Sequence, residues 1–114
     1  MVVVQIEHIE AVNNLEAILS VPGVDAYFVG PYDLSGSLGI PGEFEHPEFI
    51  HAMEAIQRIA KSSRKPGGRH IVEPDTPALI KCIKEGDRFL AYSMDTRILD
   101  TVCRGALSAI GQLK

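Results

Sequence analysis

Apolar and polar positions change their period repeatedly along the chain. Residues 2–7 form a nearly continuous β-branched run, typical of a strand covered on both faces, and residues 9–19 repeat apolar positions at helical spacing. This order of strand and helix occurs four times, with a predicted loop or short helical turn at 33–36. The further predicted strands are 26–29, 69–73 and 89–94, and the further predicted helices are 47–62, 77–85 and 95–110.

Four strand–helix units in series predict an α/β fold with parallel strands and right-handed crossovers. A complete (β/α)₈ barrel has eight such units and needs ~250 residues, whereas this chain has 114. A small doubly wound sheet is the competing architecture, but residues 7–10, Glu-His-Ile-Glu, replace its glycine-rich phosphate-binding turn. We therefore expect half of a (β/α)₈ barrel, as a single partial-barrel domain over residues 1–114.

Composition excludes several classes of partner. With 46% hydrophobic and 23% charged residues, the chain has the make-up of a folded soluble domain. Its net charge is −4 and its one basic stretch, 61–65, is interpreted as a solvated helix end, so nucleic acid is not an expected partner. Apolar runs are too short for a membrane span. Cys82 and Cys103 lack metal-ligand spacing, which favours reduced thiols and a cytoplasmic location.

Polar side chains stand where the predicted strands end. Gln5 and Glu7 are two residues apart and project to the same side of their strand, and Asp33 follows the next strand. Catalytic groups of parallel α/β proteins gather at these carboxyl ends, and two carboxylates with water suit magnesium or manganese. A competing interpretation makes Asp33 the cap of a short helix. We interpret Asp95 as a helix cap and favour a site-lining role for His70 over a core hydrogen bond.

Two segments carry a resemblance to a known family. They are Gln-x-Glu within residues 4–7 and Gly-Pro-x-Asp-Leu-Ser within residues 28–35. Together they look like the C-terminal half of the HpcH/HpaI aldolase family, which includes 4-hydroxy-2-oxoheptanedioate and 2-dehydro-3-deoxyglucarate aldolases. The similarity continues in family order at 21–25, 38–42, 46–47, 65–68 and 94–96.

The resemblance implies an enzyme that cleaves or forms 4-hydroxy-2-oxo acids, with pyruvate as the enolate partner and an aldehyde as the other substrate. It implies a (β/α)₈ barrel, commonly in homo-oligomers such as hexamers, with a divalent cation between Glu7 and Asp33. Magnesium and manganese are the expected cations, with cobalt as a third candidate. The expected pyruvate-binding groups are the Gln5 side chain and backbone groups around Gly30, Tyr32 and Ser35.

The chain also departs from the family pattern. Tyr32 stands where a small residue is usual, so its bulk is expected to narrow the pocket or mark a different aldehyde. Arg69 replaces an apolar residue, and we expect its side chain to face the helix layer or to be displaced. The family's arginine and histidine for oxo polarisation and proton transfer precede everything present here. The alternatives are therefore a non-catalytic metal- or oxo-acid-binding half barrel, or a relative of citrate lyase β-type enzymes.

Overall fold

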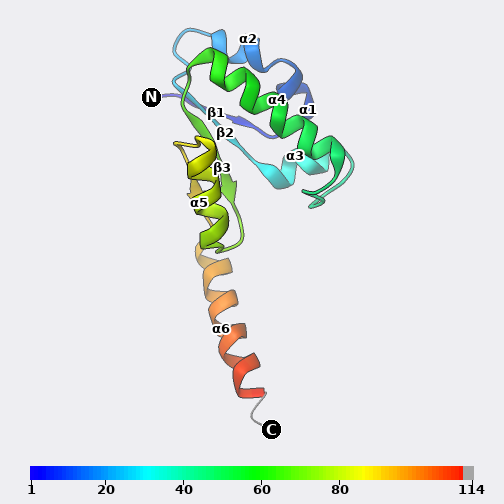
Figure 1. The fold of residues 1–114 in the computed structure, drawn as a ribbon, viewed down its shortest axis with the longest axis vertical. Coiled ribbons are helices and arrows are strands. Elements are labelled where there is room, and N and C mark those ends of the chain that lie inside the picture. The colour runs from blue at the N-terminus through cyan, green and yellow to red at the C-terminus, as the bar shows by residue number, and fades with distance from the viewer. Residues whose placement is uncertain (112–114) are drawn as a thin grey trace.

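Four parallel strands form one sheet in the order β1-β2-β3-β4 in the computed structural model, which describes residues 1–111 (Figure 1). Sequence order and spatial order coincide, as expected for consecutive strand–helix units of a barrel. The strands are β1 (Val3–Ile6), β2 (Ala26–Val29), β3 (Gly67–Ile71) and β4 (Ala91–Tyr92).

The last two strands differ from their predicted bounds. β3 begins two residues early, because the extended backbone at Gly67 and Gly68 already pairs with β2. β4 is only two residues long, since the backbone at Phe89 crosses close to Gly68, where an added Cβ would lie 2.0 Å from the Phe89 carbonyl oxygen. At the other end, Ser93 adopts a left-handed φ of 55° and ends the strand.

Six helices are described between and after the strands. The predicted helix 9–19 is two helices, because Asn14 leaves helical geometry and hydrogen-bonds through its backbone and side-chain nitrogens to Glu10. Of the two alternatives for 33–36, the short helical turn is correct: these residues lie within a helix that begins with Pro31, at a position that suits proline. The helices are α1 (Ile9–Asn13), α2 (Leu15–Ser20), α3 (Pro31–Ser37), α4 (Pro47–Ser63), α5 (Thr76–Glu85) and α6 (Asp95–Gly111).

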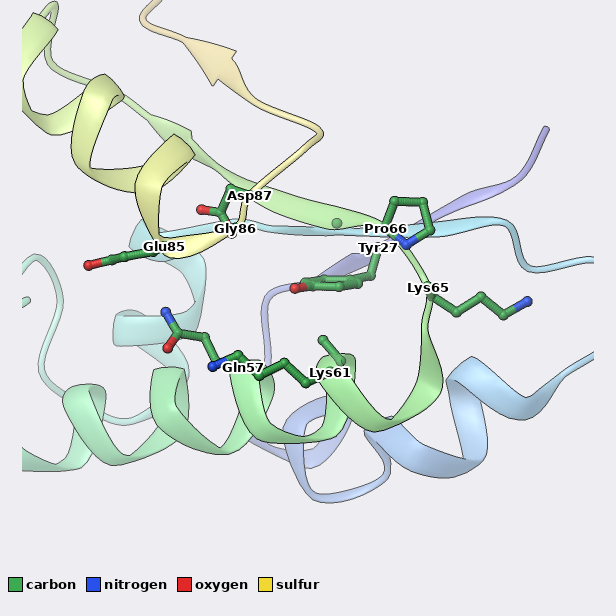
Figure 2. A pocket seen from close by; sticks show the side chains of 10 residues that line it. Tyr27, Gln57, Lys61, Lys65, Pro66, Glu85, Gly86 and Asp87 are labelled. Carbon is green, nitrogen blue, oxygen red and sulfur yellow. The ribbon is translucent and has the colours of Figure 1, made fainter.

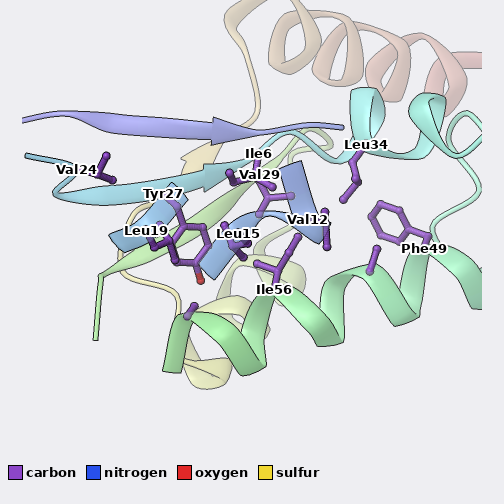
Figure 3. Close-up of a cluster of buried hydrophobic side chains, with 12 residues drawn as sticks. Ile6, Val12, Leu15, Leu19, Val24, Tyr27, Val29, Leu34, Phe49 and Ile56 are labelled. Carbon is purple, nitrogen blue, oxygen red and sulfur yellow. The ribbon is translucent and has the colours of Figure 1, made fainter. Parts of the chain in front are cut away.

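The core lies on one face of the sheet, between the strands and helices α1, α2 and α4 (Figure 3). Apolar side chains recur along α4 at three- and four-residue spacing, so they form one stripe that packs against this face. Complete burial of one such large side chain stabilises the fold by ~1.5–3 kcal/mol. The cluster comprises Ile6, Val12, Leu15, Leu19, Val24, Tyr27, Val29, Leu34, Phe49, Ala52, Ile56 and Ala60.

The opposite face of the sheet is open. Phe28 meets Phe89 edge to face at 5.5 Å between ring centroids, and Phe89 is still 41% exposed. Helix α6 runs away from the sheet (Figure 1) and buries none of its residues. Within residues 1–111, no helix is long and apolar enough to cross a membrane.

Candidate functional site

Gln5 and Glu7 form a hydrogen-bonded pair at the carboxyl end of β1. Gln5 Nε2 donates to Glu7 Oε2 at 2.7 Å, which fixes one carboxylate oxygen and leaves the other available as a ligand. Gly30, which follows β2, lies directly against this pair. A Cβ at that position would lie 3.1 Å from Gln5 Nε2 and 3.3 Å from Glu7 Oε2, so a side chain there would press on both groups. Gly30, which has no side chain, therefore leaves room for the hydrogen-bonded pair.

Asp33 lies in the first turn of α3, at the end of the neighbouring strand. Ile6 pairs in register with Val29, so the segments that carry Glu7 and Asp33 leave the sheet side by side at its carboxyl edge. Both carboxylates belong to exposed residues. The fold thus places Glu7 and Asp33 after consecutive strands, as predicted.

The two carboxylates are oxygen donors of the kind that hard cations prefer. Among the described residues, no group of three or more histidine, cysteine, aspartate or glutamate side chains is arranged to hold a metal ion. Magnesium commonly binds through only one or two protein carboxylates and keeps several waters, or takes oxygen atoms from its substrate. Glu7 and Asp33, open to solvent on neighbouring strand ends, fit this kind of donor set.

Two serine hydroxyls hold α3 in position beneath the site. Ser35 is fully buried; its Oγ donates to the Tyr32 carbonyl at 2.8 Å and accepts from Gly42 N at 2.9 Å. Ser37 Oγ accepts from Ile9 N at 3.0 Å and so ties α3 to the chain just after Glu7. Ser35 therefore contributes to the site by holding the backbone, and Ser37 is a positioning residue that no local motif indicated.

The Tyr32 ring turns toward α4. It packs edge to face on Phe44 at 4.9 Å between centroids, and Phe44 in turn lies 5.2 Å from Phe49. These rings line a cleft of about 250 Å³ between α4, the end of β3 and the start of α5, and neither Gln5 nor Glu7 belongs to its lining. Because the Tyr32 ring packs on Phe44, its bulk lies away from Gln5 and Glu7.

His70 projects to the open face of β3. Its Nε2 lies 3.1 Å from the Ser93 carbonyl, and a carbonyl can only accept, so Nε2 carries the hydrogen in this contact. The ring centroid is 6.4 Å from that of Phe28. The two interpretations of His70 are therefore compatible, because it makes a hydrogen bond and also lies on the face that carries Gln5.

The Arg69 side chain faces the helix layer, which confirms the first of the two expectations for it. Its Nε donates to Asp87 Oδ2 at 2.7 Å and its Nη2 to Glu85 Oε2 at 3.1 Å. Burial lowers the pKa of Arg69, but Asp87 and Glu85 outweigh it and raise that pKa above its ordinary value. The guanidinium is thus a permanent cation that fastens α5 to β3, on the face away from Gln5 and His70.

A second cleft of about 160 Å³ lies at the opposite end of the strands (Figure 2). Tyr27 forms one wall, and burial, followed by the charge of Asp87, raises the pKa of its phenol. Gly67 is necessary here, since an added Cβ would lie 2.0 Å from the Tyr27 ring. The amino ends of strands in such folds serve stability, so we place the candidate site at the Glu7 end.

Known proteins are similar to this chain in both sequence and fold. The chain is 46% identical over 96 residues to the pyruvate aldolase of Rhizobium etli. This match covers 83% of the chain and 37% of that protein. It is 41% identical over 106 residues to the 4-hydroxy-2-oxo-heptane-1,7-dioate aldolase of Salmonella paratyphi C, covering 92% and 38%. The chain thus spans less than two fifths of the length of these relatives.

The crystal structure of an HpcH/HpaI aldolase from Desulfitobacterium hafniense DCB-2 superposes with a TM-score of 0.88 at 34% identity. The match covers 98% of this chain and 43% of that one, which confirms the expected half barrel. Residues 1–100 match the family described as HpcH/HpaI aldolase/citrate lyase. The chain therefore belongs to the HpcH/HpaI aldolase/citrate lyase family and forms part of its (β/α)₈ barrel.

Proposed function

We propose that this chain provides the metal- and pyruvate-binding half of an aldolase that cleaves or forms 4-hydroxy-2-oxo acids. Pyruvate is the enolate partner and an aldehyde is the other substrate. The observation that carries the proposal is the Glu7 carboxylate, held by Gln5, with Asp33 at the end of the adjacent parallel strand. Relatives named as pyruvate and 4-hydroxy-2-oxo acid aldolases support this reaction class.

In this proposal Glu7 and Asp33 hold magnesium or manganese, with cobalt as a third candidate. When bound, such a cation supplies Lewis-acid stabilisation of the charge that develops on the 2-oxo oxygen. Gln5 uses one Nε2 hydrogen to hold Glu7 and has a second for a substrate oxygen. Backbone groups around Gly30 and Tyr32 bind the pyruvate carboxylate.

Ser35 and His70 have supporting roles. Ser35 is fully buried, so it holds the Tyr32 carbonyl and does not itself contact pyruvate. His70 lines the open face, where the bond to Ser93 fixes its ring. We assign proton transfer to no residue of the described chain, because none has a matching position in the family pattern.

A non-catalytic metal- or oxo-acid-binding module is the second candidate function. The observation that supports it is the pair of exposed carboxylates, Glu7 and Asp33, on neighbouring strand ends, which a binding module needs as much as an enzyme does. Both candidates require the same metal site, so metal binding is the first property to measure.

We predict that manganese binding depends on both carboxylates, because one carboxylate with water rarely holds this kind of cation tightly. Titration calorimetry on Glu7→Gln and Asp33→Asn should show affinity at least ~10-fold weaker, a loss of ~1.4 kcal/mol. Glu16→Gln is the matched control, since Glu16 is an exposed carboxylate on α2 and should bind like the unmodified chain. Unchanged affinity in either site variant would remove the proposed site.

A further inference from the structure

The cleft of about 160 Å³ at the amino ends of the strands is built from the inner part of the sheet (Figure 2). Tyr27 belongs to β2 and Gly67 to β3, and each of these strands pairs with a neighbour on both sides. The turn after α5 is fixed to them, because the backbone nitrogens of Arg88 and Phe89 both donate to the Gly67 carbonyl. The walls of this cleft therefore lie within residues 27–87 and include neither the open edges of the sheet nor α6.

Tyr27 brings a buried hydroxyl to this cleft. The residue is 6% exposed, and its hydroxyl makes no hydrogen bond within residues 1–111. Figure 2 shows the hydroxyl pointing into the space between α4 and the turn at Gly86. Because its pKa is raised, the phenol keeps its proton and can both donate and accept. A buried hydroxyl of this kind is stabilised when a ligand supplies its hydrogen-bond partner.

The α4 side of the cleft offers a cation and an amide. Gln57 and Lys61 are four residues apart and therefore share one side of the helix. Within residues 1–111 neither side chain makes a hydrogen bond or an ion pair, so both are available to a ligand. Lys65 also lines the cleft, but its ammonium group donates to the Val24 carbonyl. The positive charge of this wall is thus that of Lys61.

The facing wall carries carboxylates (Figure 2). Asp87 Oδ2 accepts from Arg69 Nε at 2.7 Å, whereas Asp87 Oδ1 accepts no hydrogen bond within residues 1–111. Both oxygens of Glu85 face cations, Arg69 at 3.1 Å and Lys81 at 3.9 Å. At the Tyr27 hydroxyl the negative charge prevails, since Asp87 raises its pKa more than Arg69 lowers it. Asp87 is therefore the acceptor that this wall offers to a ligand.

We propose that this cleft binds a small zwitterion of the α-amino acid class. The carboxylate of the ligand contacts Lys61 and Gln57, its ammonium group contacts Asp87, and the Tyr27 hydroxyl bonds to it between the two walls. A cavity of ~150 Å³ holds benzene, and alanine has as many non-hydrogen atoms, so the cleft is large enough. Opposite charges on facing walls favour a zwitterion, because an ion of one sign would be repelled by one wall. This inference is independent of manganese binding and of aldolase chemistry.

Amide NMR during titration with L-alanine tests the site. The amides of Gly67 and Gly86, which border the cleft, should shift saturably with a Kd below ~10 mM. Propionate lacks the ammonium group and ethylamine lacks the carboxylate, so each should bind at least ~10-fold more weakly. A Kd for L-alanine above ~10 mM overturns the site. Propionate or ethylamine that binds as tightly as L-alanine overturns its assignment to a zwitterion.

Two substitutions locate the binding within the cleft. Lys61→Gln removes the cation and should weaken L-alanine binding at least ~10-fold. Tyr27→Phe removes only a hydroxyl that has no partner in the fold, so the chain stays folded and binding should weaken at least ~3-fold. Lys84→Gln is the matched control, because Lys84 is an exposed lysine of α5 outside the lining. Equal affinities of the Lys61→Gln and Lys84→Gln variants, or unchanged affinity in Tyr27→Phe, would place L-alanine elsewhere and refute the proposal.

Discussion

At the scale of single residues, Ser93 combines two unfavourable features, one of its backbone and one of its side chain. It combines a left-handed φ of 55° with burial to 8% exposure, and its hydroxyl has no hydrogen-bond partner among the described residues. A residue with a Cβ pays a conformational penalty in this region, and an unpaired buried hydroxyl adds to it. Its carbonyl nevertheless accepts from His70, so the strained backbone fixes a side chain of the candidate site.

Ser93→Gly should therefore raise the free energy of unfolding by about 1 kcal/mol, because glycine adopts positive φ without the Cβ penalty. Urea denaturation measures the change. Ser62→Gly is the control: Ser62 is exposed within α4, where glycine should cost about 0.5 kcal/mol. A loss of stability on replacing Ser93 would mean that its hydroxyl makes a stabilising contact.

At the scale of elements, ion pairs of Arg69 with Glu85 and Asp87 hold the end of α5 to β3. The Arg69 and Asp87 side chains are both largely buried, and Asp87 retains 8% exposure. By contrast, the pair between Lys81 and Glu85 lies at the surface, 3.9 Å apart. Breaking a buried pair leaves an uncompensated charge, whereas an exposed pair is worth ~0–1 kcal/mol.

Asp87→Asn should accordingly lower the free energy of unfolding by ~3 kcal/mol, because it removes one charge of the buried pair. Lys81→Ala should lower it by less than ~0.5 kcal/mol. Both are read from the midpoint of urea unfolding. Equal midpoints for the two variants would show that Glu85 alone suffices to compensate Arg69.

At the scale of the whole molecule, the chain has the proposed metal donors without an assigned acid–base group. We expect purified chain with manganese to release pyruvate from 4-hydroxy-2-oxo acids more slowly than ~1 per second, since proton transfer commonly supplies ~10²- to 10⁴-fold. A coupled assay for pyruvate measures the rate. Turnover of ~1 to 10³ per second would instead show that residues of this chain perform the proton transfer.

The sequence by itself determined the features that depend on neighbouring residues. Helical and strand periods predicted four parallel strand–helix units in order, and these are confirmed. Asp75 caps α5 through Ala78 N and Gly86 ends that helix with positive φ, and both are local features, since a cap needs only residues within one turn. Alternation along β1 placed Gln5 and Glu7 on one side for the same reason.

The tertiary structure decided whatever depends on residues far apart in the chain. It shortened β4, because Phe89 crosses close to Gly68, and it turned Arg69 toward Asp87, 18 residues away. It also joined His70 to the Ser93 carbonyl, 23 residues further on. Local periodicity carries no information on these contacts, because which side chains meet depends on the register and packing of separate units in space.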